Sequence, residues 1–396
     1  MPALQHTFPE RRHDLDWLRV LAFGLLIFYH TGMFFVSWEW EIKNNVTSTD
    51  FEPFMMFPNQ WRMSLLFLIS GAAVYFALDK LPGKAFLWER TKRIFFPLVF
   101  GMLFVIPPQI YFERLSKGAS LEYLDFQLSV FRLQPYPEGN FSWHHLWYLI
   151  YIFTYSLLFL PLFLWLRSEK GRCFADRMIR AFRFPALIYA FALVQFANEL
   201  WLRDGWEISH NLVADWYNHV LSAGFFVAGF VLCTQPRLWQ AITNLRKWSL
   251  VLGLLTATVL YAFYWIDWHD LAGKELTLYR LLKSFNRWFW MLAILGYARK
   301  HLNFNSAFLR YANPAVYPFY ILHQTVIIVI AYYATDWQWN VFAKFMYISL
   351  STFAVCWVLY EFVIRRFNPL RFLFGMKPAK KPERQLAVAQ KAGLGF

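Results

Sequence analysis

The stretch DLDWLRVLAFGLLIFYH at Asp14–His30 begins with two aspartates and continues as a mainly apolar run that contains Arg19 and His30. A membrane-spanning helix needs roughly 20 predominantly apolar residues. The run is too long for the apolar core of a secretory signal and lacks a small-residue cleavage site, so we interpret it as a first membrane span. Because ionisable residues inside spans are costly, they usually have a function.

The composition of the whole chain indicates a membrane protein. Of 396 residues, 58% are hydrophobic and only 16% are charged, whereas soluble domains average about 25% charged residues. This composition excludes an ordinary soluble enzyme, a disordered chain and a coiled coil. We predict an all-α fold, a polytopic membrane helix bundle of about ten transmembrane helices. The predicted spans are Leu15–Val36, Met63–Leu78, Ile94–Phe112, Leu146–Leu166, Phe184–Leu202, His219–Cys233, Leu250–Ile266, Leu281–Ala298, Ala315–Tyr333 and Val341–Ile364.

The distribution of charge predicts the orientation of these spans. The formal net charge is +14, and 28 of the 39 Lys and Arg residues fall in the two terminal segments and in alternate loops. Cytoplasmic loops carry the excess of Lys and Arg, so both termini are predicted to be cytoplasmic. We assign residues 1–376 to one transmembrane domain and residues 377–396 to a disordered basic cytoplasmic tail.

Several common kinds of site are not indicated. The three cysteines are far apart and no ligand spacing is present, so no metal site is predicted. The sequence also has no P-loop, GxSxG, HExxH or dinucleotide-binding glycine pattern, which argues against ATP-driven pumping and serine-hydrolase chemistry.

Arg19 and His30 are eleven residues apart, or about three helical turns, so they share one face about 16 Å apart. Arginine suits a phosphate or carboxylate, and a neutral imidazole can abstract a proton from a hydroxyl. In the alternative interpretation, Arg19 pairs with Asp16 at the membrane surface and His30 is a hydrogen-bonded core residue. The spacing alone leaves both interpretations open.

Other polar residues are candidates for donor binding on the cytoplasmic side. Arg90, Lys92 and Arg93 precede the third span and form either an anion clamp or an ordinary positive-inside loop. The Ser70-Gly71 step in the second span either permits close helix packing or leaves room for a ligand.

A further group of candidates lies nearer the outer side. Trp143 and His145 open the fourth span, where they would either bind an acceptor hydroxyl or lie at the interface. His323 falls near the middle of the ninth span. Glu199 and Arg287 are polar span residues whose partners the sequence does not reveal.

Several motifs together resemble the acyltransferase 3 family of integral membrane acyltransferases. They are Arg19-x10-His30, FLISG at Phe67–Gly71, Arg90-x-x-Arg93, HLWYL at His145–Leu149 and YPFYILHQ at Tyr317–Gln324, in the same order as in that family. The ending LYEFVIRRFNPLRFLFGMKP resembles the branch that is associated with succinylation of osmoregulated periplasmic glucans.

The resemblance implies a multi-pass protein of the bacterial inner membrane that moves an acyl group from cytosolic acyl-CoA to a periplasmic glucan or another carbohydrate. Succinyl-CoA or acetyl-CoA is then a co-substrate, and no cofactor is permanently bound. We expect His30 to act as general base with Arg19 as its catalytic partner. Arg90, Lys92, Arg93 and Ser70 would bind the donor, and Trp143, His145, His323 and Arg287 are second-rank or acceptor-side candidates.

The sequence leaves alternatives open. A covalent acyl-enzyme on Ser70 is a variant of direct transfer, and the acceptor could be another polysaccharide or a small molecule. A succinyl group carries an extra carboxylate, for which Arg287 is a candidate partner. A proton-coupled transporter of an anionic substrate is the main rival class, although the inverted repeats typical of such proteins are not evident. No nucleic acid is expected as a partner, and a homo-oligomer is neither indicated nor excluded.

Overall fold

The computed structural model describes residues 11–181, 184–266 and 269–379. Within these ranges the chain forms helices and no strand, which confirms the predicted all-α class. The longer helices are α1 (His13–Met33), α2 (Glu52–Leu78), α11 (Trp216–Thr234), α12 (Pro236–Leu260), α13 (Gly273–His301), α14 (Ala307–Ala334) and α15 (Val341–Val358). The shorter helices are α3 (Gly83–Arg90), α4 (Phe96–Phe100), α5 (Pro107–Ser116), α6 (Tyr123–Val130), α7 (Trp147–Leu158), α8 (Leu160–Arg167), α9 (Glu169–Ala181), α10 (Phe191–Trp201) and α16 (Asn368–Leu373). Single 3₁₀ or π turns are η1 (Thr49–Phe51), η2 (Thr91–Phe95), η3 (Gly101–Val105), η4 (His144–Leu146), η5 (Pro185–Ala190), η6 (Tyr261–Trp265) and η7 (Leu359–Ile364).

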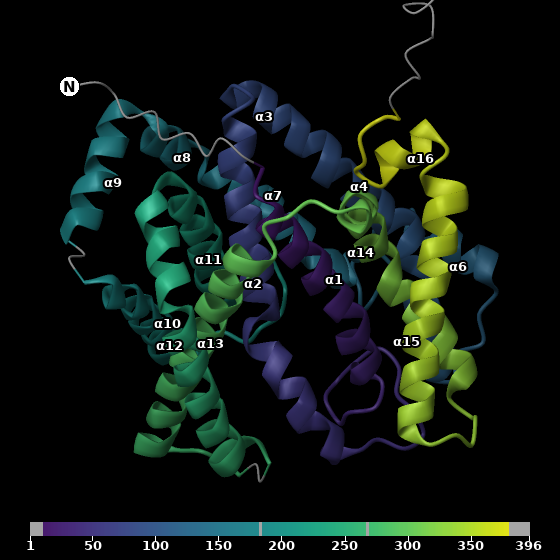
Figure 1. Ribbon diagram of the computed structural model, residues 1–396. Coiled ribbons are helices and arrows are strands. Elements are labelled where there is room, and N and C mark those ends of the chain that lie inside the picture. Colours follow the sequence, from purple (N-terminus) through teal and green to yellow (C-terminus); the bar gives the residue numbers. More distant parts are fainter. Residues whose placement is uncertain (1–10, 182–183, 267–268, 380–396) are drawn as a thin grey trace, which may run out of the picture.

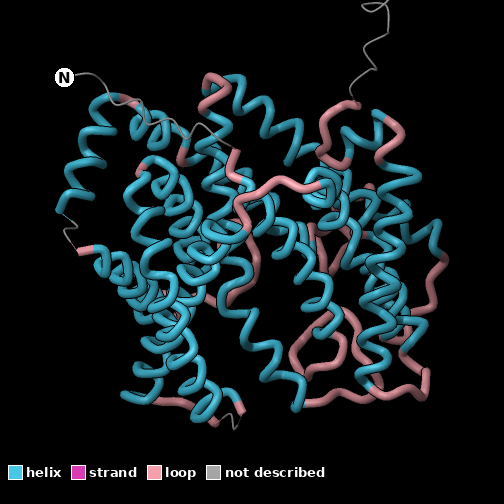
Figure 2. Tube along the Cα trace, in the orientation of Figure 1, coloured by secondary structure: helices cyan, strands magenta, loops and turns pink. Residues whose placement is uncertain are grey.

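The helices α1 and α2 run through the centre of the bundle (Figures 1 and 2). On one side, α11 packs on α2, and α12 and α10 pack on α13; on the other side, α14 packs between α1 and α15. The start of α1 and the helix α16 lie at the same end of the molecule (Figure 1). The two described ends of the chain therefore lie on one side, while the assignment of that side to the cytoplasm stays a prediction.

All ten predicted spans fall on helical stretches, but they differ in apolar character. Six are long and apolar enough to cross a membrane, or seven if the bent pair His144–Leu158 and Leu160–Arg167 is one span. The three predicted spans that do not qualify lie on α1, on α10, which has only 11 residues, and on α13. These three helices carry Arg19 and His30, Glu199, and Arg287. The total of ten spans stays a prediction.

The helix that carries the second predicted span begins well before Met63. The helix α2 begins at Glu52, eleven residues before Met63, and has 27 residues, so this span is not short. The polar residues Asn59, Gln60 and Arg62 precede the predicted span, yet they lie within α2 and line a cavity.

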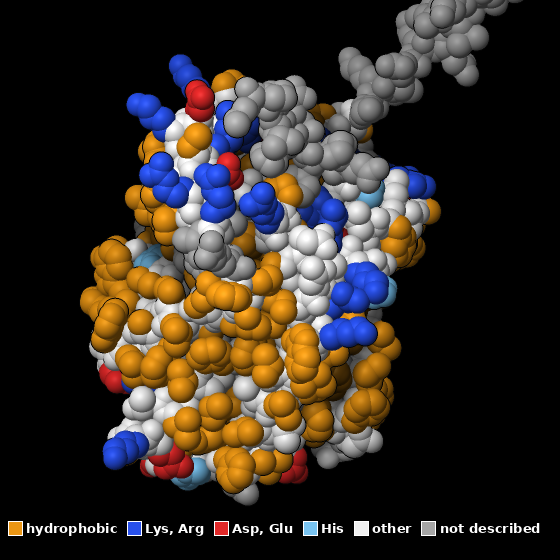
Figure 3. Space-filling model, turned by 60° about the vertical axis from the view of Figure 1, so that its left-hand side comes forward, with side chains coloured by type: hydrophobic (Ala, Val, Ile, Leu, Met, Phe, Trp, Pro, Cys, Tyr) orange, Lys and Arg blue, Asp and Glu red, His pale blue; other side chains and the backbone are white. Residues whose placement is uncertain are grey.

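The outer surface of the bundle has the apolar character that a bilayer requires. Figure 3 shows hydrophobic side chains in a broad belt, with most of the visible Lys and Arg residues gathered above it. Large apolar residues are exposed on α12 and α15, among them Leu255 (59%) and Leu350 (55%). In water such a surface would be unfavourable, whereas hydrocarbon solvates it well.

The helices α2 and α11 approach each other through two glycines. A Cβ added at Gly71 would lie 1.8 Å from the carbonyl oxygen of Phe226, and one added at Gly229 would lie 1.9 Å from that of Leu68. Backbones this close leave no room for any side chain at either position. Of the two interpretations of Ser70-Gly71, close helix packing is therefore found at Gly71.

We expect Gly229→Ala to destabilise the protein by about 1–3 kcal/mol, because its methyl group would force α2 and α11 apart. The matched control is Gly224→Ala on the same helix, since no atom lies within 4 Å of the added Cβ. Thermal unfolding of both variants in detergent tests this expectation. Equal melting temperatures for the two variants would contradict the packing argument.

Candidate active site

His30 of α1 and His323 of α14 form a hydrogen-bonded pair. Nδ1 of His30 lies 3.0 Å from Nε2 of His323, and the two rings stack with centroids 5.0 Å apart. Nδ1 of His323 lies 2.7 Å from the carbonyl oxygen of Tyr320, which can only accept. In neutral His323 the proton is therefore on Nδ1, and its Nε2 accepts a hydrogen bond from Nδ1–H of His30.

This arrangement leaves Nε2 of His30 unprotonated. The nitrogen has no hydrogen-bond partner in the part of the chain that the structure describes. A neutral imidazole with a free Nε2 lone pair is the form that a general base needs. His30 is thus held in the reactive tautomer by a series of hydrogen bonds that runs through His323 and ends at the carbonyl oxygen of Tyr320.

His30 lines a cavity of about 1240 Å³. Its wall is formed by the helices α1, α2, α5, α7, α11, α13 and α14 and by the loops 34–48, 131–143 and 202–215. Of the residues predicted from the sequence, His30, Trp143, His145 and Arg287 line this cavity, and His323 lies directly behind His30. The cavity is large enough for a sugar unit together with an acyl chain.

His145 differs from His30 because both of its nitrogens have partners. Nε2 lies 3.2 Å from the carbonyl oxygens of Tyr320 and Ile321, and the side-chain amide of Gln109 lies 3.3 Å from Nδ1. Nε2 therefore carries the proton and Nδ1 accepts from Gln109. His145 has no free lone pair, so its geometry suits positioning rather than proton abstraction.

Trp143 lines the cavity with its apolar ring and also makes a hydrogen bond through its indole N–H. Its indole Nε1 donates to the carbonyl oxygen of His210 at 3.1 Å. The ring of His210 stacks on Trp147 with centroids 4.1 Å apart. These contacts join the start of α7 to the loop 202–215 at the rim of the cavity.

Arg19 lies at the other end of α1 and does not line the cavity. Nη2 donates to Asp16 at 3.0 Å and also to the side-chain oxygen of Asn313 on α14. The expected pairing with Asp16 is therefore present. Its Nε is buried without a hydrogen-bond partner among the described residues, so part of the guanidinium can still bind another group.

The three cations before the third predicted span are not equivalent. Lys92 and Arg93 both pair with Glu89, at 2.6 and 3.1 Å. Arg90 has no carboxylate partner in the described ranges, and its guanidinium lies 4.9 Å from the centroid of Phe86. The group carries a surplus of positive charge, with Arg90 as its unpaired member.

Ser70 is hydrogen-bonded to Tyr148 at 2.5 Å, and the Tyr148 hydroxyl lies 3.1 Å from the carbonyl oxygen of Leu66. Because that carbonyl can only accept, Tyr148 donates to it and Ser70 donates to Tyr148. The ring of Tyr148 lies 5.8 Å from the ring of Tyr320. Tyr148 therefore lies between the Arg19 end of α1 and the histidines.

Two groups of polar residues thus lie on opposite sides of the Tyr148–Tyr320 contact. One contains Arg19, Arg90 and Ser70, and the other contains His30, His145 and Arg287. The structure does not bring Arg19, Ser70, Arg90, Lys92 or Arg93 into the lining of the cavity.

Several residues of the cavity were not predicted from the sequence. Arg62 lies on α2 with its guanidinium 3.5 Å from the centroid of Tyr29, and Lys283 on α13 pairs with Glu199 at 2.9 Å. A clear signal existed for Lys283, because it lies four residues before Arg287 and so on the same helical face. Arg62 had no such signal, since the apolar run begins directly after it.

Comparisons with known proteins agree with the family that the motifs resemble. The family described as an acyltransferase domain, acyltransferase 3, matches residues 12–361. Similar proteins named glucans biosynthesis protein C occur in Escherichia coli O81 (strain ED1a), Escherichia coli K12 and Shigella dysenteriae serotype 1 (strain Sd197). Each is 22% identical to this chain and covers 96% of it and 98% of its own length. These relatives belong to the branch indicated by the ending Leu359–Pro378.

Glu41, in the loop between α1 and α2, is a carboxyl group of the cavity that titrates near neutral pH. Its Oε1 accepts a hydrogen bond from the Gln324 side chain at 2.7 Å. Burial raises the pKa of Glu41 from its ordinary value of 4.5 to about 7, and repulsion from Glu113 adds to this. Burial also lowers the pKa of Lys43, whose charge opposes the rise at Glu41, to about 8.

We expect Glu41 to make the protein less stable, relative to a Glu41→Gln variant, as the pH rises from 5 to 7.5. In this range folded Glu41 still holds a proton that the unfolded chain has released, so raising the pH favours unfolding. Lys43 acts in the opposite direction, but only above about pH 8. The melting temperature of the purified wild type, measured relative to that of Glu41→Gln at each pH, should fall over this range. Identical slopes for wild type and variant would show that Glu41 does not titrate there.

Proposed function

The chain belongs to the acyltransferase 3 family of membrane acyltransferases, and on this premise we propose that it carries an acyl group from acyl-CoA to a hydroxyl of a periplasmic glucan. The observation that carries the proposal is the free Nε2 of His30 beside a large cavity. The names of the relatives support a glucan acceptor. The assignment of a succinyl group rests on the resemblance to the same branch.

In this proposal the donor binds at the Arg19 end of α1. The CoA phosphates contact Arg90, Lys92 and Arg93, where positive charge exceeds the single carboxylate of Glu89. The pantetheine arm then passes Arg19, whose Nε is unpartnered among the described residues. The buried hydroxyl of Tyr317 is a second unpartnered polar group of the described chain and supports a polar ligand on this side.

The thioester lies beside His30, and the acceptor hydroxyl enters through the cavity. Nε2 of His30 removes the hydroxyl proton while the oxygen attacks the thioester carbonyl carbon. The carbon–sulfur bond breaks, and the CoA thiolate takes up the proton that His30 received. Holding both reactants in one site supplies much of the rate enhancement.

His323 is the positioning residue of this step. When His30 becomes an imidazolium, its Nδ1–H remains hydrogen-bonded to Nε2 of His323. A catalytic histidine is commonly oriented by a third group that fixes its tautomer, and here that group is a neutral imidazole. Its Nδ1–H is in turn fixed by the carbonyl oxygen of Tyr320.

We favour direct transfer over a covalent intermediate on Ser70. Its hydroxyl donates to Tyr148 rather than to a base, whereas a nucleophilic serine needs an adjacent base. An acylated Ser70 peptide, trapped and identified by mass spectrometry, would replace the direct scheme with the two-step one.

His30→Ala should abolish acyl transfer, because the proposed general base is removed. The assay uses purified full-length protein with radiolabelled succinyl-CoA or acetyl-CoA and a linear glucan, and it measures label on the sugar. The control is His301→Ala, an exposed histidine at the end of α13 that should retain wild-type activity. Retained activity in His30→Ala would remove His30 from the chemistry.

The same assay separates the competing functions. Label on the glucan from acetyl-CoA alone would make the protein an O-acetyltransferase. In proteoliposomes, uptake of an anionic substrate without labelled sugar would instead indicate a transporter, in which the His30–His323 pair carries protons.

His323→Ala should lower kcat about 100-fold or more with little change in KM, because His30 would lose the acceptor that fixes its tautomer. His323→Gln should restore part of the activity, since its side-chain oxygen can accept from Nδ1 of His30. A merely structural role predicts no such rescue. Equal activity of the Ala and Gln variants would argue against positioning by His323.

A further inference from the structure

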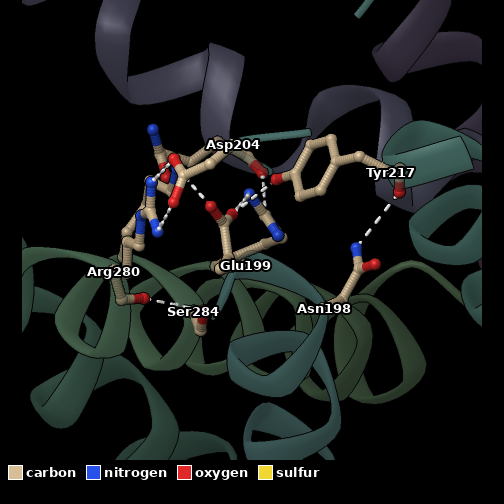
Figure 4. A network of polar contacts seen from close by, with 9 residues as sticks. Asn198, Glu199, Asp204, Tyr217, Arg280 and Ser284 are labelled. Carbon is tan, nitrogen blue, oxygen red and sulfur yellow. Dashed lines mark hydrogen bonds and ion pairs between the residues drawn. The ribbon is translucent and has the colours of Figure 1, made fainter. Parts of the chain in front are cut away.

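A buried charge cluster forms part of the wall of the cavity (Figure 4). Glu199 of α10 is fully buried and accepts a hydrogen bond from the Tyr217 hydroxyl at 2.5 Å. It pairs with Lys283 at 2.9 Å and with Arg287 at 3.4 Å. Figure 4 shows the hydroxyl of Tyr217 directed at Glu199, with the separate Asp204–Arg280 pair beside them. Two cations therefore share one carboxylate, which leaves one positive charge uncompensated.

Arg287 also has an unused donor. Its Nε donates to the carbonyl oxygen of Gln60 at 2.9 Å and its Nη2 contacts Glu199. Nη1 is buried and has no hydrogen-bond partner in the described ranges, although Arg287 is only 5% exposed. A buried guanidinium nitrogen without a partner is unfavourable, so such an atom commonly faces a ligand.

Arg62 adds a second uncompensated charge. It lies two residues from Gln60 on α2 and has no carboxylate partner among the described residues. Its Nη2 contacts Asn59 at 3.2 Å, its Nε is unpartnered, and the guanidinium lies over the ring of Tyr29. Because Tyr29 directly precedes His30, Arg62 lies close to the proposed base.

Arg62, Lys283 and Arg287 line the same cavity as His30. The cavity also holds three acidic residues: Glu113 pairs with Lys117, Glu41 accepts a hydrogen bond from Gln324, and Glu39 is exposed. A further cation, Arg203, lies 5.3 Å from the ring centroid of Tyr217. The wall formed by α2 and α13 is therefore the positively charged part of the cavity.

We propose that Arg62, Lys283 and Arg287 form a subsite for an anionic group of the substrate, a carboxylate or a phosphate, within reach of His30. Cations buried in excess of carboxylates are stabilised when an anion completes the charge balance. Guanidinium groups suit these anions because they offer paired N–H donors to two oxygens. This inference rests on the proposed function, since it places the anion on an acyl donor or a glycan acceptor.

The anionic group has two sources, and matched probes distinguish them. The acyl source is represented by monomethyl succinate, with dimethyl succinate as the neutral counterpart. The glycan source is represented by glucose 6-phosphate, with glucose as the neutral counterpart. Binding to the purified full-length protein is measured from the rise in melting temperature at constant ionic strength. This readout needs no catalysis, so it can succeed even if the proposed transfer reaction is wrong.

At least one anionic probe should stabilise the wild-type protein more than its neutral counterpart. Arg62→Gln should weaken the binding of that probe about ten-fold or more, because a hydrogen bond to a charged group is lost. Glu199→Gln should strengthen the binding of the same probe, since Lys283 and Arg287 would lose their carboxylate partner. The control is Arg132→Gln, an exposed arginine in a loop, which should bind as the wild type does.

Two results would contradict the proposed subsite. One is equal stabilisation by the charged and neutral members of both probe pairs. The other is a loss in Arg132→Gln as large as that in Arg62→Gln, which would indicate general charge attraction. Preference for monomethyl succinate assigns the subsite to the acyl group, and preference for glucose 6-phosphate assigns it to the glycan.

Discussion

The carbonyl oxygen of Tyr320 fixes the protonated nitrogen of His323 behind the cavity and, together with that of Ile321, the protonated nitrogen of His145 in its wall. It accepts from Nδ1 of His323 at 2.7 Å and from Nε2 of His145 at 3.2 Å. A bundle in hydrocarbon must satisfy its polar groups internally, so a single backbone acceptor can fix two tautomers. Through His323, the Tyr320 carbonyl also fixes the tautomer of His30, which lines the cavity. The proposed chemistry depends on this chain of hydrogen bonds.

The aromatic contact between Tyr148 and Tyr320 separates the two polar groups of the bundle. On one side, Arg19 ties α1 to Asn313 of α14; on the other side, His30 ties the same two helices together through His323. Two hydrogen bonds therefore join α1 and α14 at two levels of the bundle, and the rings of Tyr148 and Tyr320 lie between these levels. In the proposed reaction, a thioester from one compartment and a hydroxyl from the other would meet at this layer.

The helices could be predicted from the sequence because apolar runs of sufficient length have few other stable structures in a bilayer. The shared face of Arg19 and His30 also follows from helical spacing alone. The partnership of His30 with His323 could not be predicted, since 293 residues separate them and periodicity does not tell which helices pack together. Arg62 was missed for a different reason: polar residues at the start of α2 precede the predicted span, but they line a cavity.

The third member of the His30 arrangement is an uncharged ring, whereas many hydrolytic enzymes have an aspartate there. A fixed negative charge at this position would repel any acyl chain that ends in a carboxylate, and it would oppose the positive wall formed by Arg62 and Arg287. A neutral orienting group avoids this conflict. The price is that the imidazolium formed during transfer has no carboxylate paired with it among the described residues. This favours prompt return of the proton to the departing thiolate over a long-lived charged intermediate.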